Sequence, residues 1–274
     1  MSIVNLWLKT FLDILFFPCR SFSPWIALIF ISFLTGLFLL AVYKVFSNQQ
    51  KIKIAKNRIK AHLLELRLFS DDLVISLQAQ GQLFFWNLKY FLQVLRPLVI
   101  MVIPLSFLLS HLNLWFAWEP MPPGERMIVK IKLKEGVNLQ NFNISLESTE
   151  GYEVETPPLR IEAEKEINWR IKALKSGKFE MPFWFDNQKI TKEIIIGSNS
   201  WQRLSPVRPA SGLIRELLNP GERPLSDSLI EEIVISYPSR RLNFFGLKIH
   251  WLIAYFFLSI ITGLILKRPL KVEI

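Results

Sequence analysis

The chain has 274 residues, of which 51% are hydrophobic and 13% aromatic, and its formal net charge at pH 7 is +10. A single cysteine, Cys19, excludes a disulfide framework and a thiolate metal site within one chain. The positive excess suits anionic lipid headgroups, with a nucleic acid or the ribosome as the alternative partner.

The first predicted element is an amphipathic helix within residues 1–20. Its polar and apolar residues recur at helical spacing on separate faces, with Ser2, Asn5, Lys9 and Asp13 on one and Ile3, Trp7, Phe11 and Ile14 on the other. That pattern is typical of a helix lying in the membrane interface. The segment lacks the basic start and the small-residue cleavage site of a signal peptide.

Three uncharged apolar runs follow. They contain 23, 22 and 18 residues and lie between Arg20 and Lys44, between Arg96 and Glu119, and between Lys248 and Lys267. A helix of about 20 residues crosses a hydrocarbon core about 30 Å thick, and backbone groups in lipid must be hydrogen-bonded internally. The sequence therefore predicts three transmembrane helices, at residues 21–46, 97–118 and 247–266.

The charges between these runs predict the orientation. The segment from Lys44 to Arg96 holds nine basic and three acidic residues, whereas the segment from Glu119 to Lys248 holds 19 basic and 18 acidic residues. Short basic loops stay in the cytoplasm, and long segments cross largely regardless of charge. We therefore expect a multi-pass protein of a bacterial inner membrane, with the N-terminus outside and the tail at 267–274 inside.

The basic loop at 47–95 predicts an antiparallel helical hairpin. Two apolar stripes occur, the first at Ile52, Ala55, Ile59, Leu63 and Leu66, and the second at Leu73, Leu77, Phe84, Leu88, Phe91 and Leu95. Ser70, with Asp71 and Asp72 behind it, predicts the start of the second helix. Two interpretations stay open. Either the stripes only pack on each other, or the leftover apolar area around Phe84, Phe85 and Trp86 contacts client segments or a partner.

Outside the membrane, residues 124–197 predict an immunoglobulin-like β-sandwich. Apolar residues alternate with a period of two at 127–133, 167–173 and 179–185, and shorter apolar pieces lie at 144–146, 152–154, 159–161 and 190–196. Such a domain binds or spaces, so an extracytoplasmic protein partner is expected. A connector at 198–245 contains a predicted short helix at 213–218 and a strand at 233–237.

Sequence motifs for catalysis are missing from the chain. It has no GxSxG, no HExxH and no phosphate-binding glycine loop, and its three histidines do not form a ligand set of the kind zinc requires. We therefore expect no enzymatic activity, no metal and no cofactor.

Polar residues within the spans are the remaining candidates for a site. Ser32-Phe-Leu-Thr35-Gly36-Leu37 in the first span is echoed by Ser259-Ile-Ile-Thr262-Gly263-Leu264 in the third. Small and hydroxylated residues at such spacing let helices pack closely. The alternative is a shallow polar groove, open to the cytoplasm, that lowers the cost of moving polar segments into the bilayer. The candidate groove residues are Ser32, Thr35, Ser106, Ser259 and Thr262.

Residues 3–116 and, more loosely, 247–266 resemble the YidC/Oxa/Alb membrane-insertase superfamily, most closely its short three-span members. The likeness lies in an amphipathic segment followed by Pro24-Trp25 and a long aliphatic helix, and in the proline-bracketed run from Arg96 to Pro104. The family often has an arginine in the first core span, where this chain reads Phe33-Leu-Thr-Gly36. The chain also inserts some 130 residues before its third span.

The resemblance implies a protein that assists insertion or assembly of other membrane proteins without a cofactor. Its partners would be membrane lipids and client membrane proteins, and the long insertion indicates an added task outside the membrane. The rival hypothesis is a non-catalytic scaffold or subunit of an envelope complex, in which the sandwich binds a partner and no groove exists.

Overall fold

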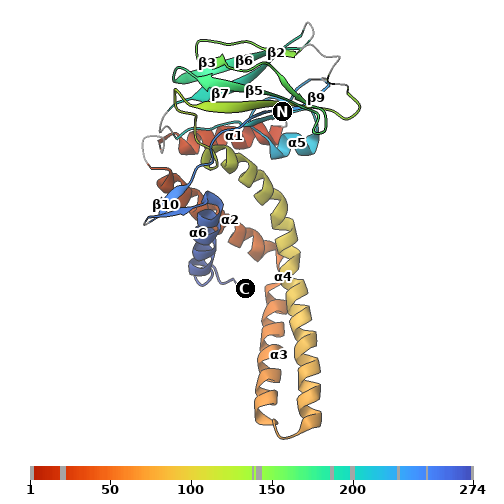
Figure 1. Ribbon diagram of the computed structural model, residues 1–274. Coiled ribbons are helices and arrows are strands. Elements are labelled where there is room, and N and C mark those ends of the chain that lie inside the picture. Colours follow the sequence, from red (N-terminus) through yellow and green to blue (C-terminus); the bar gives the residue numbers. More distant parts are fainter. Residues whose placement is uncertain are drawn as a thin grey trace. The chain divides into compact units, whose positions relative to one another are not determined.

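A computed structural model describes residues 3–18, 23–137, 139, 144–185, 188–197, 201–226, 229–244 and 246–272 (Figure 1). Cys19 lies outside these residues. The chain forms two compact units. The β unit comprises Met1–Ala27 and Ser106–Trp251, and the helical unit comprises Leu28–Leu105 and Leu252–Ile274.

The larger sheet of the β unit is built around strand β1 (Arg126–Leu133). Strand β1 pairs antiparallel with β5 (Glu166–Ala173) on one side and with β9 (Ile230–Ile235) on the other. The sheet is completed by β3 (Tyr152–Val154), β4 (Leu159–Ile161) and β8 (Val207–Pro209), in the order β3-β5-β1-β9-β8 with β4 also paired to β5. Every pairing in it is antiparallel.

A second, three-stranded antiparallel sheet shares its core with the first. Its strands are β2 (Ile144–Leu146), β6 (Gly177–Phe185) and β7 (Gln188–Ile196), in the order β2-β6-β7. The alternating residues of β1, β5 and β6 enter one apolar cluster, in which the Trp169 and Phe183 ring centroids lie 5.9 Å apart. An antiparallel β region with two sheets is therefore present, while its immunoglobulin-like class stays a prediction.

The β region extends past the predicted boundary at residue 197. Strand β9 comes from the segment predicted to be a connector, yet it pairs with β1 from Val129↔Ile235 to Leu133↔Ile230. Leu204 and Leu225 of the same segment are buried in the shared core. The connector is thus an integral part of the sheet domain. Within it, α5 (Leu213–Leu218) matches the predicted short helix.

Helix α1 (Ile3–Phe16) packs on the β unit through one face. Leu12 and Phe16 are buried, and the Phe16 ring contacts the rings of Trp115 and Trp201 edge-on at centroid distances of 5.3 and 5.4 Å. Asn5, predicted on the polar outer face, is instead buried against the protein. The reason is a hydrogen-bond partner that the local pattern does not reveal, the backbone carbonyl of Glu216.

Among the described residues, two helices are long and apolar enough to cross a membrane, α2 (Pro24–Phe46) and α4 (Leu73–Phe116). Helix α4 has 44 residues and joins the second arm of the hairpin to the second predicted span without a break. Its length is about 66 Å at about 1.5 Å per residue. The two helices contain the first two predicted spans, and their length and composition are weak evidence for membrane association.

The third predicted span is shorter than expected. Helix α6 (Trp251–Leu266) has 16 residues, about 24 Å of helix. Residues predicted to begin the span form strand β11 (Leu247–Ile249), which pairs with β10 (Leu242–Phe244). The hydrogen bonds of this small hairpin take the place of the first helical turn. A third transmembrane crossing therefore stays a prediction.

Helix α3 (Gln49–Leu68) and the first part of α4 lie side by side as the predicted hairpin (Figure 1). Asn48 caps α3, because its side chain accepts a hydrogen bond from the Lys51 amide at 3.0 Å. Asp72 caps α4 by accepting from the amides of Val74 and Ile75 at 3.0 and 3.2 Å. Ser70 was predicted for that role, but Asp72 directly precedes the first helical residue.

The two predicted stripes of the hairpin have different outcomes. Ile52 and Ala55 of α3 are buried as predicted, whereas Leu63 is 52% exposed. The α4 stripe is wrong as a packing face, because its members are 38–76% exposed, namely Leu73, Leu77, Phe84, Leu88, Phe91 and Leu95. Within the hairpin part of α4, the buried and half-buried residues include instead Ala79, Leu83, Trp86, Tyr90, Val94 and Pro97. This second set also recurs every three or four residues, the spacing typical of a hairpin seam.

Candidate functional site

Four of the five candidate groove residues come together where α2 packs against α6. Ser32, Thr35 and Ser259 are buried, with exposed fractions of 0%, 3% and 6%, and Thr262 is half-buried. The Ser259 hydroxyl donates to the backbone carbonyl of Ser32 at 3.3 Å. The echoed sequences of the two helices therefore meet, as their similarity suggested.

Gly36 lies at the closest approach of this helix pair. A Cβ atom at Gly36 would be 2.8 Å from the Ser259 carbonyl oxygen and 2.9 Å from the Thr262 Cβ, closer than real Cβ contacts. Its echo, Gly263, has open space around the same position. Only one glycine of the pair is thus required by packing. Ser32 meets Ser259 and Gly36 meets Thr262, so the helices run parallel.

The hydroxyl groups at this contact are largely engaged by the backbone. Thr35 Oγ1 donates to the Ile31 carbonyl at 2.7 Å, and Thr262 Oγ1 donates to the Leu258 carbonyl at 2.9 Å. The Ser32 hydroxyl has no hydrogen-bond partner among the described residues. These polar groups face a neighbouring helix or their own backbone, which favours close packing over a wet groove.

Ser106, the fifth candidate, belongs to the β unit rather than to the helical unit. It is half-buried on α4, and its carbonyl accepts a hydrogen bond from the Ser110 hydroxyl at 2.9 Å. Its place in a shared groove with the other four stays a prediction.

The candidate contact residues of the hairpin differ in accessibility. Phe84 is 72% exposed and Phe85 is 48% exposed, whereas Trp86 is half-buried toward α3. The Lys89 ammonium lies 4.3 Å from the Phe85 ring centroid and 4.7 Å from that of Trp86, and the Arg58 guanidinium lies 5.8 Å from Trp86. Cations thus cover two of the three rings.

Phe84 is therefore the most accessible of the three aromatic rings, and it belongs to a longer exposed apolar surface. We name the exposed set Leu73, Leu77, Phe84, Leu88, Phe91 and Leu95 the hairpin stripe. These residues recur every three, four or seven positions, so they form one face of α4.

The C-terminal tail takes part in the base of the hairpin, which sequence reasoning missed. Val272 is buried in an apolar cluster with Leu40, Ile52 and Met101, and Leu270 packs against that cluster. The Lys44 ammonium donates to the Leu270 carbonyl at 2.9 Å. The signal was weak, because the short basic tail holds too few apolar residues to define a packing face.

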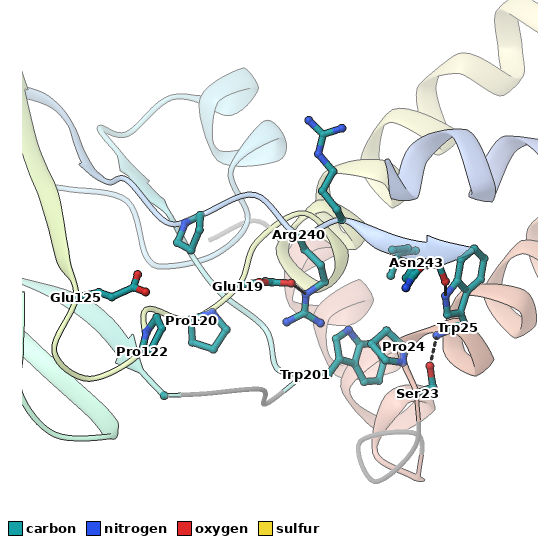
Figure 2. Close-up of a pocket in the computed structure, with 14 residues that line it drawn as sticks. Ser23, Pro24, Trp25, Glu119, Pro120, Pro122, Glu125, Trp201, Arg240 and Asn243 are labelled. Carbon is teal, nitrogen blue, oxygen red and sulfur yellow. Dashed lines mark hydrogen bonds and ion pairs between the residues drawn. The ribbon is translucent and has the colours of Figure 1, made fainter. Parts of the chain in front are cut away.

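The β unit holds an open cleft of about 670 Å³ beside the first turn of α2 (Figure 2). Trp25 Nε1 donates to the Asn243 carbonyl at 3.0 Å. Arg240, whose side chain is 8% exposed, points toward Glu119, with 3.8 Å between Nε and Oε1. Burial lowers the pKa of the Arg240 guanidinium, and the charge of Glu119 opposes that shift.

The residues that line this cleft are suited to binding a ligand or a partner rather than to catalysis. Its lining combines indoles, prolines and both signs of charge, and it contains Trp25, Pro120, Trp201, Pro238 and Arg241. No nucleophile paired with a base occurs among these residues. The lining residues come from four separate stretches of the β unit. For this reason no local sequence pattern predicted the cleft.

One buried ion pair in the β unit stabilises the segment after β7. Lys192 is fully buried, and its ammonium donates to the Ser205 carbonyl at 2.6 Å and to the Glu222 carboxylate. Burial lowers the pKa of Lys192, and the negative charge of Glu222 opposes the shift. The pair joins strand β7 to the segment that leads into β9, so its role is structural.

Among the described residues, no group of three or more His, Cys, Asp and Glu side chains is placed to hold a metal ion. Comparison of the chain with protein-family models, curated proteins and solved structures found no match.

Proposed function

We propose that this protein assists the insertion or assembly of other membrane proteins in a bacterial inner membrane. Its clients would contact the hairpin stripe on the cytoplasmic side before they enter the bilayer. The observation that carries the proposal is the exposure of this stripe, since none of its six members is covered by α3.

The physical argument begins with the size of the stripe. Leaving large apolar side chains in water costs about 25 cal/mol per Å² relative to covering them. A contiguous patch of this kind on a soluble surface marks an interaction site. The hairpin is also strongly basic, so membrane insertion of the stripe would compete with solvation of the lysines around it.

Continuity with α4 adds a second argument. The stripe lies on the same unbroken helix as the second predicted span. An apolar client segment that binds beside Leu88 and Leu95 is therefore already aligned with a path toward the hydrocarbon. The resemblance to the insertase superfamily supports the same role. The packed α2–α6 pair would then have a structural role. The proposed function does not require a polar groove between these helices.

The scaffold hypothesis is the second candidate, and one observation favours it. The hydroxyls of Thr35, Ser259 and Thr262 are used in close helix packing, as expected if α2 and α6 only anchor the chain. In that case the cleft of the β unit would hold an extracytoplasmic partner.

Site-specific photocrosslinking separates the two functions. A photoreactive amino acid at Phe84 should crosslink to a ribosome-bound nascent inner-membrane protein. The matched control is Gln82, exposed on the opposite face of the same helix, where crosslinks should be absent. Crosslinks from Phe84 to one stable subunit, independent of translation, would support the scaffold. Equal crosslinking from both positions would contradict a binding role for the stripe.

A further inference from the structure

Two helices of the β unit expose apolar side chains that the unit itself does not cover. On α1 and the residue that follows it, Trp7, Phe11, Ile14 and Phe17 are 75%, 49%, 70% and 71% exposed. On α5, Leu213, Ile214 and Leu218 are 77%, 74% and 56% exposed. Helix α5 has no buried residue, so packing inside the β unit does not explain its sequence.

A hydrogen bond joins the two helices into one surface. The Asn5 side-chain amide donates to the Glu216 carbonyl at 2.8 Å, which ties α1 to the middle of α5. Asn5 is 1% exposed, and the His111 imidazole lies 3.3 Å from its carbonyl oxygen. Figure 1 shows α1 and α5 next to each other beneath the sheets. We call the seven residues named above the α1–α5 platform.

The platform lies at the end of an apolar helix. Phe16 of α1 packs on Trp115 and Phe116, the last residues of the candidate span α4. Trp251, which begins the apolar helix α6, stacks on Phe116 with 6.0 Å between centroids. Tryptophan is enriched where hydrocarbon gives way to headgroups. With α4 as a transmembrane helix, as predicted, this end of α4 would bring the platform to the level of the headgroups.

The connection that carries α5 is longer than its strands require. Strands β8 and β9 are antiparallel neighbours, so a turn of about two to five residues would join them. Instead residues 210–229 intervene and include α5. Part of this connection is structural, because Glu222 pairs with Lys192 and Leu225 lies in the shared core, but α5 makes neither contact.

We propose that the α1–α5 platform is a lipid-binding surface, with α5 as a second anchor that inserts Leu213, Ile214 and Leu218 into the outer leaflet beside α1. The occupant is the phospholipid bilayer of the membrane that the spans cross. Arg215 of α5 pairs with Glu231 at 2.9 Å, whereas Lys9 is half-buried on α1, a position from which a long side chain reaches headgroup phosphates. The β unit is thereby held against the bilayer at two points.

The test uses the full chain in lipid nanodiscs. In a Cys19→Ser background, Ile214→Cys is labelled with the environment-sensitive dye NBD, and the lipids carry a nitroxide on the acyl chain. NBD at position 214 should show blue-shifted emission, strong quenching by the nitroxide lipid and weak quenching by aqueous iodide. The matched control is Leu159→Cys on β4, 62% exposed in the same unit. There iodide should quench and the nitroxide lipid should not.

Two outcomes overturn the proposal. The first is a probe at 214 that behaves like the probe at 159, which would place α5 in water. The second is protection of the 214 probe from both quenchers, which would mean that a protein or a second copy of the chain covers α5.

A further variant tests whether lipid quenching at position 214 depends on the apolar side chains of α5, and a second probe on α1 reports whether that variant is still folded. With Leu213→Asp and Leu218→Asp added, lipid quenching at 214 should fall to the control level. A probe at Trp7→Cys in the same variant should keep its lipid quenching. Loss at both positions would overturn independent anchoring by α5.

Discussion

The sheet core and the helical hairpin contain similar apolar residues, but the core buries them and the hairpin leaves them exposed. In the sheets, alternating apolar residues are covered, so that Trp169 is 2% exposed and Phe183 is fully buried. In the hairpin, Phe84 and Phe91 are 72% and 57% exposed. A region that covers its own apolar surface is complete, whereas one that does not requires lipid or another protein. The exposed hairpin stripe therefore supports the proposal that clients bind the helical unit, whereas the sheet core offers no such surface.

The largest expected effect is all-or-none and tests whether the two regions face different compartments. In a Cys19→Ser background, Gln80→Cys in the hairpin should be shielded from a membrane-impermeant thiol reagent in intact cells. Leu159→Cys in the sheet should be labelled, because the long segment is expected outside. Permeabilised cells provide the control, in which both cysteines should react. The reverse pattern would overturn the orientation and the proposed site of client binding.

The next prediction applies the same chemical change to both regions. Trp169→Asp places a charge in an apolar core without a partner and removes a large side chain, at a cost of at least about 3–5 kcal/mol. The β unit should become sensitive to protease and lose its cooperative melting. Phe84→Asp should change stability by no more than about 0.5 kcal/mol, because the site is exposed.

Phe84→Asp should nevertheless reduce crosslinking of nascent chains from a neighbouring stripe position such as Leu88. Limited proteolysis and crosslinking measured on the same samples keep the two effects apart. A Phe84→Asp protein that unfolds would mean that the stripe is a packing surface after all.

How far the sequence predicted the fold depends on whether a signal was local. Strands β1, β5 and β6 were predicted from a period of two within each segment, and the inward face of Trp169 followed from it. The other strands up to β7 were predicted from shorter apolar pieces between turn signals. Strand β9 was recognised as apolar, but its pairing with β1 was missed. That pairing joins residues about 100 positions apart, so no periodicity within either segment could reveal it.

The candidate site shows the same division. The echo of Ser32 and Thr35 by Ser259 and Thr262 predicted that α2 and α6 carry matching patches, and these four residues meet. The seam of the hairpin was predicted wrongly. Helix α4 carries two adjacent apolar stripes, and only the covering helix decides between them. Helix α5 has only six residues. A segment this short shows no helical periodicity from which an exposed apolar face could have been predicted.

A third prediction concerns the packed helix pair and has a smaller expected effect. Gly36→Ala should destabilise the helical unit by about 1–3 kcal/mol, since the added methyl meets the Ser259 backbone and overpacking costs this much. Gly263→Ala is the matched control. Open space surrounds that position, and alanine favours a helix over glycine by about 1 kcal/mol. Thermal unfolding in detergent should thus shift in opposite directions for the two variants. Equal shifts would contradict the close contact of α2 and α6.

The smallest expected effect is a dependence on pH at the surface of the β unit. Glu155 accepts hydrogen bonds from Arg126 Nε at 2.8 and 2.9 Å and from Arg170 Nε at 3.1 Å. The hydrogen bond from Arg126 is the main cause that lowers the pKa of the Glu155 carboxyl below its ordinary value of 4.5. A carboxyl with a lowered pKa in the folded state stabilises the fold above its unfolded pKa and loses that contribution as pH falls through the folded one.

Glu155→Gln should therefore lower the melting temperature of the β unit slightly at neutral pH. The difference from the wild type should shrink as pH falls from about 4.5, where the unfolded carboxyl is protonated, through the lower folded pKa, where the Arg126-paired carboxylate is protonated too. Glu150→Gln is the control, because Glu150 and its partner Lys175 are 84% and 68% exposed with 3.4 Å between charged atoms. Exposed pairs contribute little, so this variant should match the wild type at every pH. A Glu155→Gln difference that persists unchanged into acid would show that the carboxylate charge is not what holds β3 and β5 at this point.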